Sequence, residues 1–172
     1  MRTVEKLILS FVILVVGAFC LGIAGTYAAQ PKCERLEGWV LLFKTAEGCT
    51  SPTGLCTAGI FLSSNPNWNG AKWFFTALGT APSAGLPASM EPATTLSYAG
   101  TVRITTLANN SITTSNAGVF DPAAGAFSQL DRVTGGTGQF SGAKGFIWLT
   151  GTGGDLIAGI RGEVRGNLCS PD

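Results

Sequence analysis

Residues 135–145 constrain the fold of this chain more than any other segment, because five of these eleven residues are glycine. The glycines are Gly135, Gly136, Gly138, Gly142 and Gly145, and a strand-like apolar run, residues 146–149, follows at once. Glycine at this density lets backbone segments approach closely or adopt positive φ. The segment therefore predicts a tight corner between two β-strands, in which the glycines shape the backbone and do no chemistry.

The same segment resembles a phosphate-binding loop only superficially. Counted from Gly138, Ala143 occupies the position where a Walker loop needs glycine, and Gly145 follows Lys144 where serine or threonine is required. No helical pattern follows, so no helix N-terminus is available to hold a phosphate. The spacing therefore argues against nucleotide binding.

The N-terminus has the pattern of a secretory signal peptide. Arg2 and Lys6 precede an apolar run over residues 7–23, and small residues follow up to Ala29. We expect residues 1–29 to be removed, which leaves residues 30–172 as a single domain. A retained membrane anchor is the main alternative, because the run is close to the ~20 residues that span a bilayer. A lipoprotein signal at Cys20 is disfavoured, because bulky Phe19 precedes it.

Charge in the expected mature chain is sparse and balanced, with nine basic and nine acidic side chains. Charged residues form 12% of the whole chain, about half the usual quarter. No basic patch predicts a nucleic-acid partner. A sparsely charged surface suggests that apolar side chains line a cavity or contact other subunits.

Four cysteines remain after the signal, and an even count in an exported chain predicts two disulfides. Of the three pairings that four cysteines allow, we favour Cys49–Cys56, which closes a loop rich in turn residues, and Cys33–Cys169, which joins the chain ends. The chain has no histidine. This composition disfavours a metal site and removes the usual general base and nucleophile pairs.

Short runs rich in aromatic and β-branched residues alternate with turn signals, which is typical of all-β proteins. We expect eight strands, at residues 38–44, 57–63, 71–78, 95–106, 111–120, 126–134, 145–151 and 156–165. Residues 79–93 form the longest expected connector, over the surface or across a barrel mouth. Eight antiparallel strands close readily into a barrel. Closure would place the first strand beside the last and bring Cys33 near Cys169.

The run from Asp131 to Gly145, with the strand that follows, resembles a signature of the allene oxide cyclase-like barrel family. Dirigent proteins carry a similar Gly-Gly-Thr-Gly-x-Phe-x-x-Ala-x-Gly segment. The resemblance implies an eight-stranded antiparallel barrel with an apolar cavity, and members that commonly self-associate. Known members include cyclases of reactive apolar intermediates and dirigent proteins that steer phenolic radical coupling.

This chain departs from the plant enzymes at the position where they look for an acidic residue. The first expected strand, residues 38–44, contains no carboxylate, and Glu37 lies just outside it. The role of the plant acidic residue is therefore not transferred to Glu37. The chain resembles an exported bacterial-type branch of the superfamily, and its catalytic residues stay undefined.

Three aromatic residues are the candidates for a ligand pocket, namely Trp73, Phe75 and Tyr98, although aromatics in small barrels commonly form simple core. Arg161 and Glu163 could form a polar pair in a site, but they alternate with apolar neighbours and more plausibly face solvent or another subunit.

We expect a secreted barrel, extracellular or periplasmic, that binds an apolar small molecule. The alternatives are a cofactor-independent cyclase or isomerase and a structural or surface interaction barrel without ligand. We further expect a homo-oligomer, no cofactor or metal, no nucleic acid, and no membrane association after signal removal.

Overall fold

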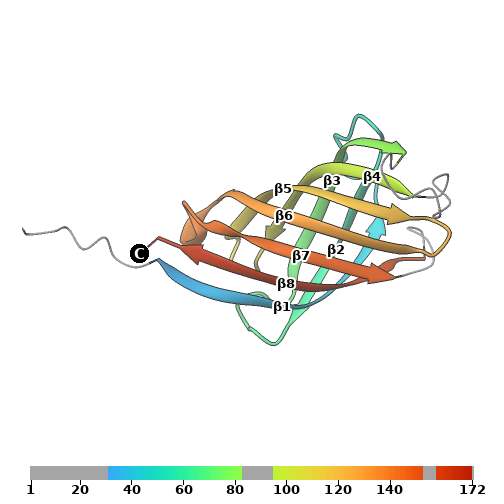
Figure 1. Cartoon of the computed structure of the whole chain (residues 1–172). Coiled ribbons are helices and arrows are strands. Elements are labelled where there is room, and N and C mark those ends of the chain that lie inside the picture. The colour runs from blue at the N-terminus through green and yellow to red at the C-terminus, as the bar shows by residue number, and fades with distance from the viewer. Residues whose placement is uncertain (1–30, 83–94, 153–157, 172) are drawn as a thin grey trace, which may run out of the picture. The chain divides into compact units, whose positions relative to one another are not determined.

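The computed structural model describes residues 31–82, 95–152 and 158–171, and these form a closed barrel of eight strands (Figure 1). The strands are β1 Lys32–Lys44, β2 Cys56–Ser63, β3 Ala71–Pro82, β4 Leu96–Thr105, β5 Ser111–Asp121, β6 Ala126–Gly136, β7 Lys144–Thr152 and β8 Ile160–Ser170. A single 3-10 turn, η1 Gly138–Phe140, is the only helical element among these residues. The predicted all-β, eight-stranded antiparallel barrel is confirmed.

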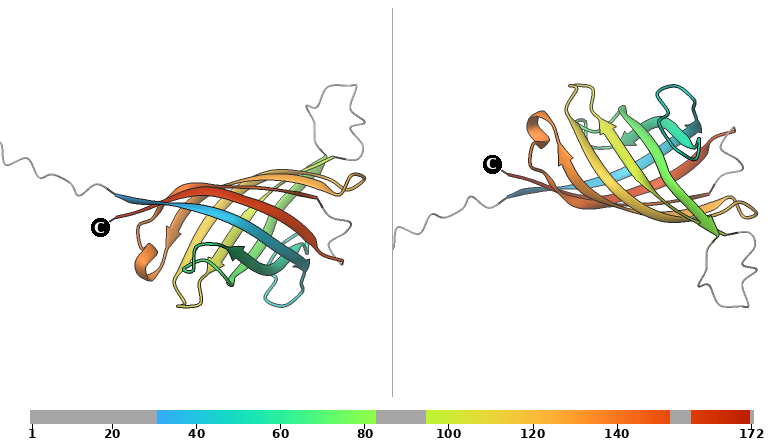
Figure 2. Two further views of the ribbon diagram at one scale, coloured as in Figure 1. Left: turned by 90° about the horizontal axis from the view of Figure 1, so that it is seen from below. Right: turned by 90° about the horizontal axis from the view of Figure 1, so that it is seen from above.

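Each strand pairs antiparallel with the next along the chain, and β8 pairs with β1 to complete the closure (Figure 2). The β1–β8 ladder runs from the Lys32–Ser170 pair to the Leu42–Ile160 pair. Closure pairs the first strand with the last, which an open sheet would leave as two free edges. The first part of β1, residues 32–37, pairs with β8 alone.

The bounds of three predicted strands were wrong. β1 begins at Lys32 rather than at residue 38, and β8 covers Ile160–Ser170 rather than residues 156–165. β3 continues to Pro82, so the first part of the expected 79–93 connector is strand. Strand pairing explains the added residues. The start of β1 pairs with the end of β8, and the end of β3 pairs with the start of β4. Residues 83–94 and 153–157 lie outside the described residues.

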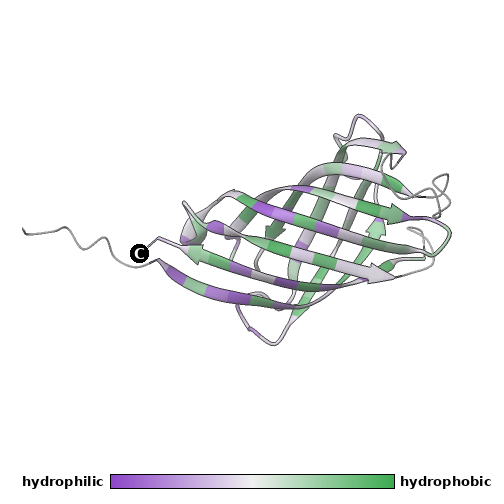
Figure 3. Ribbon diagram, viewed as in Figure 1, coloured by the Kyte–Doolittle hydropathy of each residue, from purple (hydrophilic) through white to green (hydrophobic). Residues whose placement is uncertain are grey.

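Hydrophobic and hydrophilic residues alternate along the strands (Figure 3). The buried apolar side chains form one core. On β8, for example, Ile160, Val164 and Leu168 are buried, while Arg161 and Arg165 between them are exposed. The interior is filled mainly by residues of this kind, including Leu36, Val40, Phe61, Val102, Ile104, Ile112, Ile147 and Leu149.

The glycine-rich corner closes one end of the barrel. β6 ends at Gly136, η1 follows, and β7 begins at Lys144, as the predicted strand-to-strand corner requires. Phe140 on η1 is buried and stacks on Trp68 with ring centroids 4.7 Å apart. The Trp68 Nε1 donates a hydrogen bond of 2.9 Å to Glu34 Oε1. These stacked rings fill the end of the barrel at which β1 begins and β8 ends.

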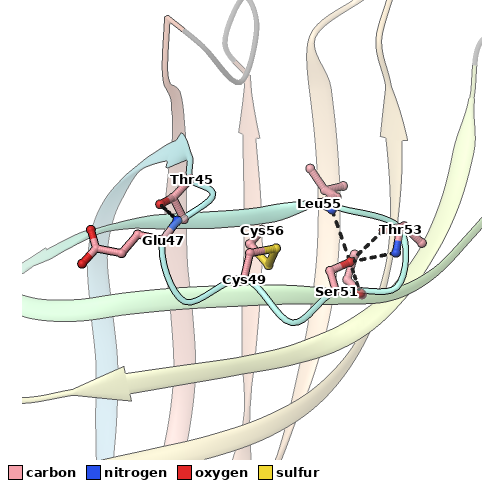
Figure 4. Close-up of a disulfide and its surroundings, with 8 residues drawn as sticks. Thr45, Glu47, Cys49, Ser51, Thr53, Leu55 and Cys56 are labelled. Carbon is pink, nitrogen blue, oxygen red and sulfur yellow. Dashed lines mark hydrogen bonds between the residues drawn. A yellow bond between two sulfur atoms is a disulfide. The ribbon is translucent and has the colours of Figure 1, made fainter.

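Both disulfides have the favoured pairing. Cys33 and Cys169 are directly opposite each other in the β1–β8 ladder and are joined by a bond of 2.03 Å. This disulfide therefore fastens the seam at which the barrel closes. Cys49 and Cys56 close the loop between β1 and β2 at the opposite end of the barrel (Figure 4).

Part of the outer surface is apolar, mainly where β1 and β2 lie side by side. Trp39, Leu41, Ile60 and Leu62 point outward there and are each about half exposed. The guanidinium of Arg161 lies 4.2 Å from the centre of the Trp39 ring, in a cation–π contact. No helix among the described residues has the length and apolar character needed to span a bilayer.

Candidate functional site

A small cavity lies inside the barrel at the end opposite the glycine-rich corner. It has a volume of about 60 Å³. Its wall is made by the C-terminal ends of β1, β5 and β7, the N-terminal ends of β2, β4, β6 and β8, and the N-terminal half of β3. The lining residues are Leu42, Leu55, Thr57, Trp73, Phe75, Tyr98, Phe120, Phe127, Gln129, Leu149 and Ile160. None of these described residues carries a formal charge, so the cavity is suited to a neutral, largely apolar group.

The structure places all three predicted pocket residues on the wall of this cavity. Trp73 and Phe75 come from β3, and Tyr98 comes from the paired strand β4. The rings of Phe75 and Tyr98 meet edge to face with centroids 5.7 Å apart. Whether any of the three contacts a ligand stays a prediction.

A chain of polar side chains leads from this cavity into the core. The Tyr98 hydroxyl donates a hydrogen bond of 2.9 Å to Gln129 Oε1. Gln129 Nε2 donates in turn to Asp131 Oδ2 at 2.7 Å. Thr114 Oγ1 and Asn116 Nδ2 both donate to Asp131 Oδ1, at 2.6 Å and 3.2 Å. Asp131 is fully buried, so these three donors must replace the water that a carboxylate normally binds.

Burial shifts the pKa of the two ionisable groups in this hydrogen-bonded series, the Asp131 carboxyl and the Tyr98 phenol. It raises the pKa of Asp131, and the hydrogen bonds from Thr114, Gln129 and Asn116 offset only part of that rise. Burial also raises the pKa of the Tyr98 phenol, with a smaller contribution from the nearby Asp131 charge. Tyr98 therefore stays neutral at ordinary pH, so it can donate or accept a hydrogen bond but cannot act as a preformed phenolate base.

Three buried polar atoms have no hydrogen-bond partner among the described residues. They are Thr57 Oγ1, Trp73 Nε1 and Asn116 Oδ1. An unsatisfied buried polar atom costs about 1–3 kcal/mol and is uncommon in native proteins. Thr57 and Trp73 both line the cavity, whereas Asn116 contacts Asp131 deeper in the core.

The disulfide-closed loop between β1 and β2 (Figure 4) contributes Leu55 to the wall of the cavity. Ser51 Oγ donates to the Ala77 carbonyl of β3 at 2.6 Å and accepts from the Leu55 amide at 3.2 Å. The Ala77 amide donates to the Leu55 carbonyl at 3.0 Å. These bonds hold the Leu55 side chain against the cavity, so the loop fixes part of the wall.

The other polar candidates from the sequence do not reach the cavity. Glu37 is exposed and pairs with Arg35 at 3.2 Å on the outside of the barrel. Arg161 contacts Trp39, also on the outside, and Glu163 accepts a hydrogen bond of 2.7 Å from Arg165. None of these charged residues lines the cavity.

Sequence reasoning missed the polar residues that the barrel places inside. Gln129 and Asp131 lie on the same face of β6 as the buried Phe127 and Val133, so their inward direction was readable from the expected strand. Their hydrogen bonds to Tyr98, Thr114 and Asn116 depend on the pairing of β4, β5 and β6, which the sequence does not contain.

Comparison with known proteins gives no match, either to a protein-family model or to a curated protein. Among the residues that the structure describes, no three histidine, cysteine, aspartate or glutamate side chains gather as a metal site would require.

Proposed function

We propose that this protein is a secreted β-barrel that binds a hydrophobic small molecule in the cavity beside Tyr98. The observation that carries the proposal is the difference between the two ends of the barrel. Trp68 and Phe140 fill one end, whereas an uncharged, mostly apolar cavity remains at the other. A cavity lowers the stability of a protein, so a barrel with a purely structural role would be more stable with both ends filled.

The cavity volume limits what can enter without rearrangement. About 60 Å³ is well below the ~300–1,000 Å³ of typical ligand pockets, and below the ~150 Å³ dry cavity that accepts benzene. We therefore propose that one end of the ligand occupies the cavity while the rest lies at the mouth, against the half-buried Leu55 and Phe120. Each buried CH₂ group would contribute about 0.8 kcal/mol.

Titration with an environment-sensitive apolar dye tests this proposal. We expect saturable binding near one dye per chain, with little dependence on salt, because no charge pairing is involved. Leu55→Trp should weaken binding by narrowing the mouth. Leu107→Trp is the matched control, since Leu107 is exposed on the turn between β4 and β5 at the plugged end. The absence of saturable binding by any apolar probe would favour a structural barrel without ligand.

A cofactor-independent cyclase or isomerase is the second candidate, and the Tyr98–Gln129–Asp131 chain is the observation that favours it. A cyclase function would also agree with the resemblance of the sequence to allene oxide cyclase-like barrels. An uncharged cavity wall with one hydroxyl suits catalysis that holds a reactive substrate folded and stabilises one developing charge. In this case Tyr98→Phe should abolish turnover and leave dye binding largely intact, whereas a simple binding protein would show no turnover to lose.

Export is proposed from the N-terminal pattern together with the two disulfides, which are typical of oxidising compartments. Residues 1–30 lie outside the described residues, so the signal peptide stays a prediction. N-terminal sequencing of protein recovered outside the cytoplasm should begin at Ala29 or Gln30. An intact Met1 there would contradict cleavage.

Self-association is a separate proposal that rests on the low charge content and on the resemblance. Analytical ultracentrifugation of the purified protein should give a mass above that of one chain, and a monomer at high micromolar concentration would contradict it.

A further inference from the structure

Two side chains on the cavity wall carry polar atoms that nothing in the described structure satisfies. Trp73 Nε1 and Thr57 Oγ1 have no hydrogen-bond partner, and the two side chains are only 1% and 3% exposed. Both residues line the same cavity. The cavity lining is therefore mostly apolar, and two residues of its wall carry unused hydrogen-bonding atoms that neighbouring atoms cover.

Strand pairing places these two residues close together. Thr57 on β2 lies opposite Phe75 on β3, and Gly59 lies opposite Trp73. Thr57 and Trp73 are thus diagonal neighbours on the inward face of two hydrogen-bonded strands, a separation that a large aromatic side chain can bridge.

The chemistry of the two groups defines what they can bind. An indole N–H only donates a hydrogen bond, and a threonine hydroxyl can donate as well. A carbonyl oxygen has two lone pairs and can accept from both. A carboxylate is a poorer fit, because no lysine or arginine among the described residues lines the cavity and a buried charge without a partner is very costly.

We propose that the cavity takes the carbonyl end of a small, neutral, otherwise apolar molecule. Its entry turns the covered Trp73 Nε1 and Thr57 Oγ1 toward the cavity, where both donate hydrogen bonds to the carbonyl oxygen. This inference rests on the proposed function, since it assumes that the cavity is a binding site, and it adds the chemical class of the ligand. The remaining lining residues, such as Leu149 and Ile160, then contact the hydrocarbon part.

Two probes of nearly the same shape separate the carbonyl from the hydrocarbon. They are 2-hexanone and 2-methyl-1-hexene, in which a CH₂ group replaces the ketone oxygen. Each is titrated into ¹⁵N-labelled protein while the tryptophan indole N–H resonances are recorded. The chain has four tryptophans, and the Trp73 resonance is assigned by its loss in Trp73→Phe. The Trp68 indole is the internal control, because Glu34 already accepts its hydrogen bond.

We expect 2-hexanone to move the Trp73 indole proton downfield in a saturable manner and to leave the Trp68 resonance unchanged. The alkene should bind more weakly and cause no downfield shift. Thr57→Val keeps the shape of the side chain but removes the hydroxyl, so it should weaken ketone binding about threefold to tenfold and leave alkene binding unchanged. The wild-type resonances decide the matter even where Thr57→Val does not fold.

Three outcomes overturn the proposal, and they differ in what else they overturn. Equal binding of both probes with no Trp73 response refutes the carbonyl site but leaves the hydrophobic binding function intact. A Trp73 proton already downfield without probe, and unchanged by the ketone, shows that resident water satisfies the indole. No binding of either probe, together with no dye binding, rejects the proposed function itself.

Discussion

Tyr98 hydrogen-bonds to Gln129 across an intervening strand, and Gly118 is the residue that leaves room for this contact. Tyr98 on β4 is paired with Gly118 on β5, which is paired in turn with Gln129 on β6. The phenol lies over Gly118 and donates to Gln129 Oε1 at 2.9 Å. A Cβ atom at position 118 would lie 2.5 Å from Tyr98 Cζ and 2.7 Å from the Ser128 carbonyl oxygen. The Tyr98–Gln129 hydrogen bond therefore depends on the absence of a side chain at Gly118.

We expect Gly118→Ala to lower the free energy of unfolding by about 1–3 kcal/mol, the usual cost of inserting a methyl group into a packed site. The phenol would have to leave its position, and the Ser128 backbone cannot yield easily. Urea denaturation measures the effect. Gly79→Ala is the matched control, because a Cβ there meets nothing within 4 Å. Equal stability of the two variants would show that the Tyr98 position is not constrained by Gly118.

Stability should depend on pH through Asp131. Burial raises the pKa of this carboxyl in the folded protein, whereas in the unfolded chain it titrates near ~3.9. The folded state therefore binds the proton more tightly. The resulting stabilisation is complete below the unfolded pKa and is lost as the pH rises through the folded pKa.

Comparison with Asp131→Asn isolates this effect, because all other titrating groups are common to both proteins. Urea denaturation between pH 3.5 and 8 should show wild-type stability falling relative to the variant as the pH rises. A difference that instead grows in favour of the wild type would mean that the hydrogen bonds from Thr114, Asn116 and Gln129 outweigh burial, and that the carboxylate is the preferred form.

The barrel itself could be predicted because its signals are local. Turn residues separate runs with inward apolar alternation, as along β8, where Ile160 and Val164 are buried and Arg161 and Arg165 are exposed. The number of antiparallel strands then favoured closure, which accounts for the expected Cys33–Cys169 pair. Strand ends could not be predicted in the same way, because β1 extends back to Lys32 only through its pairing with β8.

The residues of the candidate site could be predicted only in part, for a related reason. Inward alternation was sufficient to select Trp73, Phe75 and Tyr98. The partners of Asp131 are set by register, since Asn116 lies directly opposite it and Gln129 reaches it along the same strand. The sequence pattern of a single strand does not contain the register between strands. The role of Gly118 depends on that register as well.

The two disulfides should contribute unequally to stability. Cys33 and Cys169 are separated by 136 residues, so in the chain-entropy model their bond contributes about 5 kcal/mol. Cys49 and Cys56 are separated by 7 residues, which corresponds to about 2.5 kcal/mol. Paired alanine substitutions test each bond without leaving a free thiol. The Cys33/Cys169 variant should lose clearly more stability, and a reversed order would mean that strain or residual structure dominates over loop entropy.

The glycine-rich corner should be sensitive to a side chain at Gly138 for reasons of backbone geometry. Gly138 has a φ of 60°, a conformation that β-branched residues rarely adopt, and a Cβ there would collide with Asn110 Oδ1 at 1.8 Å. Gly138→Val should therefore lower the free energy of unfolding by about 1–3 kcal/mol or more. Gly135→Val is the control, since Gly135 lies in β6 and a Cβ there meets nothing within 4 Å. If the segment bound phosphate instead, Gly138→Val would fold normally and lose nucleotide affinity, so thermal melts and nucleotide titration of both variants distinguish a structural corner from a binding loop.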